Sequence, residues 1–142
     1  SLVGSEMCIR DSLYNYVGQP WRTQEIVDEV LHTLYFNNPD GLSGNEDCGQ
    51  MSAWYILNAM GFYQVCPGKP VYSIGRPLFN EATVHLKDGK SFKVIAHNNS
   101  RDNKYVRSIV LNGNKLETPF FTHQDIVDGG TLELTMGSEP LK

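Results

Sequence analysis

The chain has 142 residues, of which 40% are hydrophobic and 20% are charged, and its formal net charge is -4. This length suits one domain, and the composition excludes an intrinsically disordered or collagen-like chain. The acidic balance gives no electrostatic reason to expect nucleic acid as a partner, and no apolar run reaches the roughly 20 residues of a membrane span. Three cysteines are too few for a disulfide framework or a four-cysteine zinc site.

The first twelve residues have neither the basic start nor the apolar core of a signal peptide. From Leu2 to Ser12 they resemble the translation of a transposase-end adapter used in sequencing libraries. We therefore expect residues 1–12 to be a non-native leader, which is set aside when the fold is considered. On this interpretation the natural protein continues upstream of Leu13, and the chain is a C-terminal fragment that gives no information on targeting.

The first half of the remaining chain has helical periodicity. Apolar residues recur at three- and four-residue spacing over residues 26–35, and Thr23 before them is a candidate N-cap. A second helix is expected at about residues 48–60, with Gly61 at its C-terminal end. This second helix is apolar on several sides, which is typical of a buried helix. Two helices cannot enclose it, so we expect further helices from outside this sequence.

After Pro67 the apolar residues alternate with polar ones, which is typical of strands. Two turn-forming pairs, Asp88-Gly89 and Asn112-Gly113, indicate hairpins. The expected strands fall at residues 82–86, 92–96, 105–111 and 131–136, after a connection at residues 68–80. The sequence therefore predicts an α+β fold in three parts: a leader at 1–12, helices at 13–66 and an antiparallel β-rich region at 67–142.

The side chains that can perform chemistry are concentrated in the loop Gly41–Gln50, directly before the second helix. Asp47 in this loop has two interpretations. It can be the N-cap of the helix, where it would accept the first free backbone donors. A carboxylate held ionised by such donors is also suited to act as a general base on water. Calcium is a third possibility, without EF-hand spacing, because the loop offers the oxygen ligands Asp40, Asn45, Glu46 and Asp47.

Cys48 and Cys66 bracket the second helix. A helix of about 13 residues spans roughly 20 Å, and the five residues after Gly61 return only about 16 Å. A disulfide requires α-carbons roughly 4.4–6.8 Å apart, so we expect both cysteines to be free and buried. Trp21 lies in a predicted loop, where it could stack on a sugar ring or fill a core.

Five collinear segments carry a distinctive signature: Tyr14–Gln24, Gly44–Tyr55, Gly61–Tyr63, Tyr72–Phe79 and Asp128–Leu132. Together they extend over essentially all of residues 13–140, and they resemble glycoside hydrolase family 92. The resemblance implies a calcium-dependent, inverting exo-α-mannosidase that acts on mannose-containing glycans and is secreted, periplasmic or on the surface of glycan-degrading bacteria. It also implies that the helices are the last of an (α/α)6 barrel, followed by the β-rich C-terminal region.

The resemblance further implies roles for individual residues. Asp47, the last acidic residue of the Gly-Asn-Glu-Asp-Cys-Gly motif, corresponds to the general base. Asn45 and Glu46 beside it are further catalytic candidates, although an asparagine cannot exchange a proton. The expected substrate-binding residues are Trp21, Thr23 and Gln50.

The general acid and the main calcium ligands are implied to precede Leu13, and no metal ligand is assigned within the chain. We therefore expect the chain to need the missing N-terminal portion of the same protein as its partner and to be inactive alone. The alternative is a non-catalytic carbohydrate-binding or accessory module formed by the β-rich region.

Overall fold

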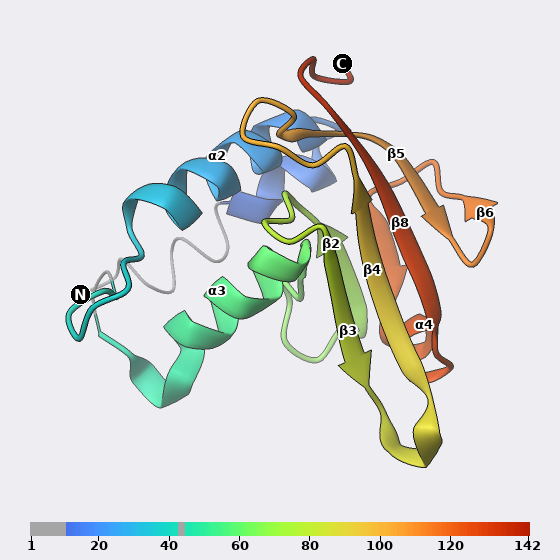
Figure 1. Ribbon diagram of the computed structural model, residues 1–142, viewed down its shortest axis with the longest axis horizontal. Coiled ribbons are helices and arrows are strands. Elements are labelled where there is room, and N and C mark those ends of the chain that lie inside the picture. The colour runs from blue at the N-terminus through green and yellow to red at the C-terminus, as the bar shows by residue number, and fades with distance from the viewer. Residues whose placement is uncertain (1–10, 43–44) are drawn as a thin grey trace.

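The computed structural model describes residues 11–42 and 45–142, with Asp47 described by its backbone alone. Helices form one side of the molecule and two sheets form the other (Figure 1). The expected leader lies outside the described residues except for Asp11 and Ser12, which are buried at the start of a helical segment, residues 11–16. No helix in the described part of the chain is long and apolar enough to span a bilayer.

Helix α2 (Pro20–Thr33) begins three residues before the expected N-cap, Thr23. Pro20 occupies the first helical turn, where its missing N–H costs nothing because that position has no intrahelical partner. Thr23 therefore lies inside the helix and is buried, and the expectation that it caps the helix is wrong. The helix buries Val27 and Leu31, which pack against Trp54 of the next helix.

Helix α3 (Gln50–Met60) follows a single 3₁₀ turn, η1 (Asp47–Gly49), and ends at Gly61 as expected. Gly61 has φ 106°, a left-handed conformation that favours glycine. The helix buries Met51 and Trp54, whereas Ile56 is 56% exposed. One face of this strongly apolar helix is therefore packed, and the opposite face is open.

The smaller sheet is antiparallel, with the order β1-β2-β7. Its strands are β1 (Phe62–Tyr63), β2 (Val71–Ile74) and β7 (Phe120–Thr122). The segment 68–80, expected to be a connection, thus contributes a strand. Since β1 precedes Pro67 and β2 follows it, this sheet has strands on both sides of the proposed domain boundary, which stays a prediction.

The larger sheet has the order β3-β4-β8-β5-β6. Its strands are β3 (Glu81–His85), β4 (Ser91–His97), β5 (Tyr105–Leu111), β6 (Asn114–Lys115) and β8 (Gly130–Gly137). Both expected hairpins are confirmed. A 3₁₀ turn, η2 (Lys87–Gly89), forms the first turn, and in the second Asn112 and Gly113 both have positive φ.

The larger sheet is mixed rather than wholly antiparallel, because β8 runs parallel to β4 and antiparallel to β5. A long connection from β6 makes this possible, since it includes β7 and the short helix α4 (His123–Val127). Thr122 and Asp125 form a capping box at the start of α4. Alternating polarity is the same in parallel and antiparallel strands, so the sequence pattern did not distinguish the two.

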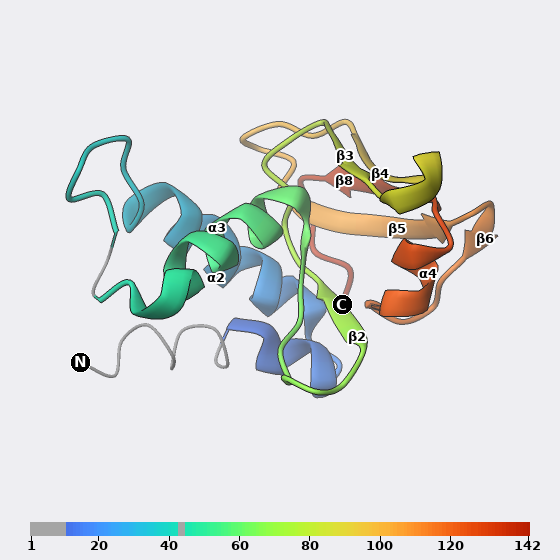
Figure 2. The same cartoon turned by 90° about the horizontal axis from the view of Figure 1, so that it is seen from below.

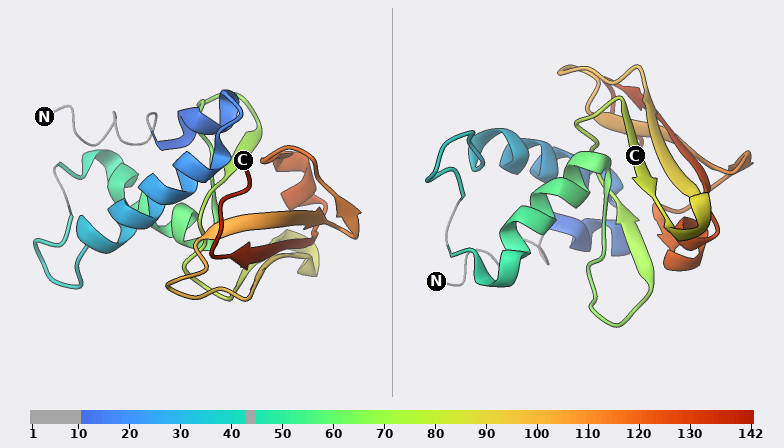
Figure 3. Two further views of the ribbon diagram at one scale, coloured as in Figure 1. Left: turned by 90° about the horizontal axis from the view of Figure 1, so that it is seen from above. Right: turned by 60° about the horizontal axis from the view of Figure 1, so that its bottom comes forward.

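The main hydrophobic core lies against the sheets and includes Phe62, Phe92, Leu132 and Leu134, each 2% exposed or less. A smaller apolar cluster lies between α2 and α3. Figure 2 and both views of Figure 3 show these helices beside the larger sheet rather than over it. Cys48 and Cys66 are free, as expected, but both are exposed, so the expectation of burial is wrong; Cys48 lies in η1 and Cys66 in the loop after β1, both outside the two cores.

One buried ion pair joins the helices to the sheets. Arg76, in the loop after β2, is 3% exposed, and its Nε lies 2.8 Å from Oδ1 of Asp28 on α2. The same guanidinium donates to the carbonyl oxygens of Pro77 and Ser100. Helix α2 is thereby held against two loops that border the larger sheet.

Candidate functional site

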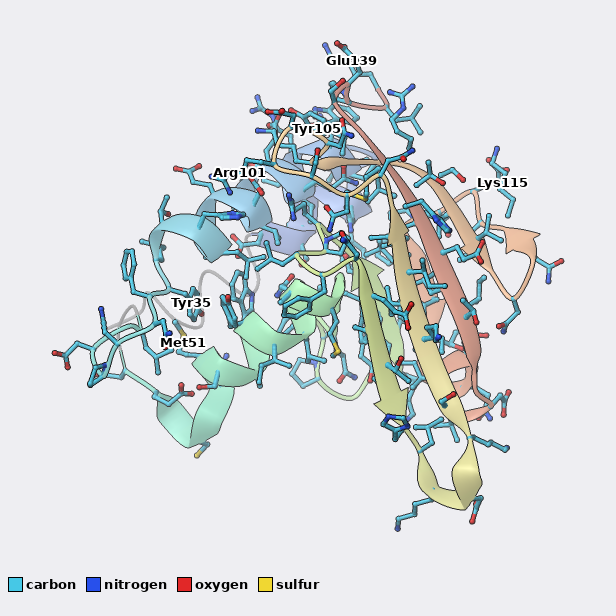
Figure 4. The ribbon with its side chains drawn as sticks, in the orientation of Figure 1. Tyr35, Met51, Arg101, Tyr105, Lys115 and Glu139 are labelled. Carbon is cyan, nitrogen blue, oxygen red and sulfur yellow. The ribbon has the colours of Figure 1, made fainter. Side chains whose placement is uncertain are left out.

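The predicted catalytic loop connects the C-terminal end of α2 to the N-terminal end of α3, so the two helices run in opposite directions (Figure 1). Tyr35, just after α2, fixes this junction. Its hydroxyl donates to the carbonyl oxygen of Met51 over 3.3 Å, and its ring stacks on Trp54 with centroids 5.6 Å apart. Figure 4 shows Tyr35 and Met51 between the two helices at this end.

Glu46 accepts the free donors at the start of α3. Its Oε1 lies 2.9 Å from the backbone nitrogen of Met51. Its Oε2 lies 3.1 Å from the backbone nitrogen and 2.6 Å from Oγ of Ser52. The first amides of a helix have no intrahelical acceptor, so a carboxylate at this place satisfies donors that would otherwise need water.

Asp47 does not occupy the N-cap position that the sequence suggested for it. The N-cap position of α3 is Gly49, two residues after Asp47, and no side chain at the N-cap position accepts a helix donor. Among the described side chains, the carboxylate of Glu46 accepts from the backbone amides of Met51 and Ser52. Although Glu46 lies before the N-cap, its side chain reaches the first amides of α3 because the turn Asp47–Gly49 folds the chain back toward the helix.

The environment of Glu46 keeps it negatively charged. The hydroxyl of Ser52 and the backbone amides of Ser52 and Met51 lower the pKa of the Glu46 carboxyl, and partial desolvation opposes this effect. The positive end of the helix dipole lies at the same place and also favours an anion. Glu46 is thus a charged acceptor at neutral pH, with both oxygens occupied by donors.

The turn that carries Asp47 has an unusual backbone. Cys48 has φ 54° and Gly49 has φ 78°, so two consecutive residues are left-handed. A non-glycine residue in this region costs roughly 1–3 kcal/mol, which surrounding contacts must offset. Asp47 directly precedes these two residues, and Asn45, Glu46 and Gln50 flank the same turn. The structure therefore brings four of the six predicted site residues together.

Trp21 and Thr23 lie at the other end of α2. Beside them, Gln24 accepts a hydrogen bond from the backbone nitrogen of Val106, so this end of the helix adjoins β5. The helix has 14 residues and is about 21 Å long. The structure does not bring these two residues to the loop, and Thr23 is 1% exposed. Their substrate-binding role stays a prediction.

An open hollow of about 430 Å³ lies beside the loop. Its lining is largely apolar and aromatic, and consists of Tyr35, Phe36, Asn37, Gly41, Leu42, Ser52, Tyr55 and Ile56. Ser52 thus borders the hollow and also donates to Glu46. The sequence analysis did not single out Ser52. It expected a carboxylate to accept the free amides at the start of the helix, but it considered Asp47 for this task and not Glu46, the partner of Ser52.

The described part of the loop shows no cluster of acidic, histidine or cysteine side chains that could hold a metal ion. No group of three or more histidine, cysteine, aspartate or glutamate side chains converges to hold a metal in the part of the chain that the structure describes. The oxygens of Glu46 already accept hydrogen bonds from α3. We therefore assign no metal ligand and no reaction step through a metal to this chain.

Comparison with known proteins identifies the family. Residues 11–138 match the model of the glycosyl hydrolase family 92 catalytic domain. The chain belongs to glycosyl hydrolase family 92. The match begins at Asp11 and extends through both helices and both sheets.

Solved family 92 structures from Bacteroides thetaiotaomicron share this fold. The α-mannosidase BT3965, solved with mannoimidazole, is 42% identical with a TM-score of 0.87, and the chain covers 17% of it. The inverting mannosidase BT2199 is 47% identical with a TM-score of 0.85, and the chain covers 18% of it. Each comparison includes 92% of the present chain. The chain therefore corresponds to less than a fifth of these family members.

A curated relative gives a similar result. An uncharacterized secreted glycosidase of Arthroderma benhamiae is 30% identical over 130 residues, which is 89% of this chain and 17% of that protein. The resemblance seen in the sequence is thus confirmed at the level of the family, and the mixed α+β fold is confirmed by the solved structures.

Proposed function

We propose that this chain is part of an inverting, calcium-dependent exo-α-mannosidase that hydrolyses α-mannosidic bonds of glycans, with Asp47 as its general base. The observation that carries the proposal is the match of residues 11–138 to the family's catalytic domain. Relatives at 42% and 47% identity are described as an α-mannosidase and an inverting mannosidase, and the first was solved with mannoimidazole. These likenesses support mannosidase chemistry for the protein that contains this chain.

The chemistry requires a carboxylate base on one face of the sugar. In an inverting glycosidase, that base activates a water molecule while an acid roughly 6.5–9.5 Å away protonates the leaving oxygen. Asn45 cannot accept a proton at neutral pH, and both oxygens of Glu46 accept hydrogen bonds from α3. Among the acidic motif residues, this leaves Asp47 as the candidate base. Its backbone lies on a turn fixed at the end of a packed helix.

The acid and the calcium ligands would come from a preceding part of the same polypeptide, which is the partner that we propose. Exposed apolar side chains on the helical side support this proposal. Val17, Phe36 and Ile56 are 67%, 59% and 56% exposed, on three different segments of the helical side. A hollow of about 610 Å³ lies between residues 11–17 and α2. Further helices packed here would complete the domain, and we expect the chain to be inactive without them.

The rival interpretation is a non-catalytic carbohydrate-binding or accessory module in the β-rich region. The family match continues through this region to residue 138, so both sheets belong to the matched catalytic domain. This continuity supports the catalytic interpretation. We also propose that the parent protein is secreted, periplasmic or on the cell surface, in line with the secreted relative.

The proposal is tested with the full-length protein encoded by the gene that carries this segment. We expect it to hydrolyse 4-nitrophenyl α-mannoside, and we expect ¹H NMR during the first turnovers to detect β-mannose before mutarotation. First-formed α-mannose, or no turnover with any α-mannoside, would overturn the proposal. The purified 142-residue chain is expected to give no turnover, and measurable hydrolysis by it would refute the need for a partner segment.

A further inference from the structure

We infer that Glu46 is a positioning residue: it clamps the turn that carries Asp47 against the first turn of α3 and does not itself react. The inference rests on the proposed function, since it assumes that Asp47 is the base. It assigns the two neighbouring carboxylates of one motif to two different tasks.

The clamp is built from three donors on two successive residues. Met51 donates its backbone N–H to Oε1 of Glu46, and Ser52 donates its backbone N–H and its hydroxyl to Oε2, with lengths of 2.6–3.1 Å. Glu46 directly precedes the 3₁₀ turn Asp47–Gly49, and the donors follow Gln50. The contact therefore closes a ring of residues around Asp47.

The turn inside this ring needs such a clamp. Cys48 and Gly49 both have left-handed backbone conformations. If either residue adopted the more common extended conformation, the chain would turn differently and Asp47 would have another orientation. The helical side of the ring is fixed independently, because Tyr35 donates to the carbonyl oxygen of Met51. Glu46 thus connects the turn to a helix end that already has a defined place.

The same contacts argue against a direct catalytic role for Glu46. A general base must have a free lone pair directed at the attacking water. Oε1 of Glu46 accepts from the backbone N–H of Met51 and, over 3.3 Å, from that of Ser52, and Oε2 accepts from the backbone N–H and the hydroxyl of Ser52, so each oxygen has two donors. These hydrogen bonds also lower the pKa of the carboxyl, which makes it a poorer proton acceptor. The hydrogen-bond geometry and the low basicity of Glu46 therefore both favour a positioning role over a role as general base.

Four variants of the full-length enzyme test the inference. Glu46→Ala should lower kcat on the order of 10²-fold, because displacement of a reacting group by about 1 Å has a cost of this size. KM should change less than threefold, since sugar binding is not the step disturbed. Ser52→Ala should lower kcat about tenfold. Glu46→Gln combined with Ser52→Ala should be little worse than Glu46→Gln alone, because both remove the same contact.

Asp125 supplies a matched control. Its carboxylate accepts from the backbone nitrogen and the hydroxyl of Thr122, so it closes the capping box of α4 through one backbone amide and one hydroxyl, on the sheet side of the molecule. Asp125→Asn should lower the melting temperature by a few degrees and leave kcat within twofold. If Glu46 were merely a structural cap, Glu46→Ala would behave in the same way.

Azide distinguishes positioning from proton transfer. Azide carries no proton, so it can attack the anomeric carbon without a base, and the product is β-mannosyl azide as the leaving alcohol takes its proton from the acid. We expect azide to restore turnover of Asp47→Ala, where a carboxylate has been removed from the attacking face. We expect no restoration for Glu46→Ala.

The possible failures can be told apart. Wild-type turnover by Asp47→Ala would remove the proposed function, on which this inference rests. Loss of activity in Asp47→Ala with unchanged kcat in both Glu46→Gln and Ser52→Ala would overturn only the inference. Rescue of Glu46→Ala by azide would make Glu46 the base and would also overturn it. If Glu46→Ala does not fold, the kcat values of Glu46→Gln and Ser52→Ala decide whether Glu46 is a positioning residue.

Discussion

Replacing Asp28 by asparagine tests the junction between the helices and the sheets. The change removes the carboxylate whose Oδ1 lies 2.8 Å from Nε of Arg76 and leaves the buried guanidinium in place. Arg76 keeps its hydrogen bonds to the carbonyl oxygens of Pro77 and Ser100, but it loses the charge that offsets its burial. Burial lowers the pKa of the Arg76 guanidinium, and Asp28 acts in the opposite direction.

The loss in free energy of unfolding caused by Asp28→Asn can be estimated from this geometry. Removing one partner of a buried ion pair costs about 3–5 kcal/mol, because a charge stays buried without compensation. We take the lower value, about 3 kcal/mol, since Arg76 retains two carbonyl acceptors. With a urea m-value of about 2 kcal/mol per molar for a small domain, the unfolding midpoint should fall by about 1.5 M.

The assay is urea unfolding of the 142-residue chain, followed by circular dichroism, with Glu29→Gln as the control. Glu29 is the next residue on α2 and is exposed, so its neutralisation should change the free energy of unfolding by less than about 0.5 kcal/mol. A midpoint shift below about 0.3 M for Asp28→Asn, or a shift equal to the control, would refute the reasoning, because it would mean that the buried pair contributes nothing to the junction.

Three further stability changes follow from single contacts, each measured by urea unfolding. Leu134→Ala should cost about 3–4 kcal/mol, because Leu134 is 0% exposed on the central strand β8; a loss below about 1 kcal/mol would contradict that packing. Tyr105→Phe should cost about 1 kcal/mol, since the hydroxyl donates to Glu25 over 2.7 Å. This bond raises the pKa of Tyr105 to about 12 from an ordinary value of 10.0, so its stabilisation should be fully present below pH 10.0 and lost as pH rises through about 12. If the free energy of unfolding of the wild-type chain changed with pH in the same way as that of Tyr105→Phe, this contribution of the Tyr105 hydroxyl would be disproved. Thr122→Ala should cost about 1 kcal/mol through loss of the α4 capping box, and an unchanged midpoint would show that the cap is unimportant.

Local sequence signals predicted most of the elements. The two hairpins were found from Asp88-Gly89 and Asn112-Gly113, because a turn of this kind constrains only its own neighbours. Gly61 likewise marked the end of α3. The parallel pairing of β4 and β8 was not predictable in this way, since it depends on a long connection that brings distant segments together.

The position of the candidate site in the loop Gly41–Gln50 stays a prediction, and the tasks of its residues were not separable in the sequence. Asn45, Glu46 and Asp47 all precede the helix, and a capping role was open for Asp47. The structure shows that Glu46 reaches the first amides because Cys48 and Gly49 adopt left-handed conformations. Such a turn has no clear signature in a sequence where a cysteine occupies one of its left-handed positions.

The most direct test of the central claim is kcat of the full-length enzyme and its Asp47→Ala variant on an α-mannoside at neutral pH. The account predicts a fall of about 10³-fold with an unchanged melting temperature, because removal of a general base affects the chemical step and not the fold. A fall of less than tenfold would contradict the assignment of Asp47 as the base.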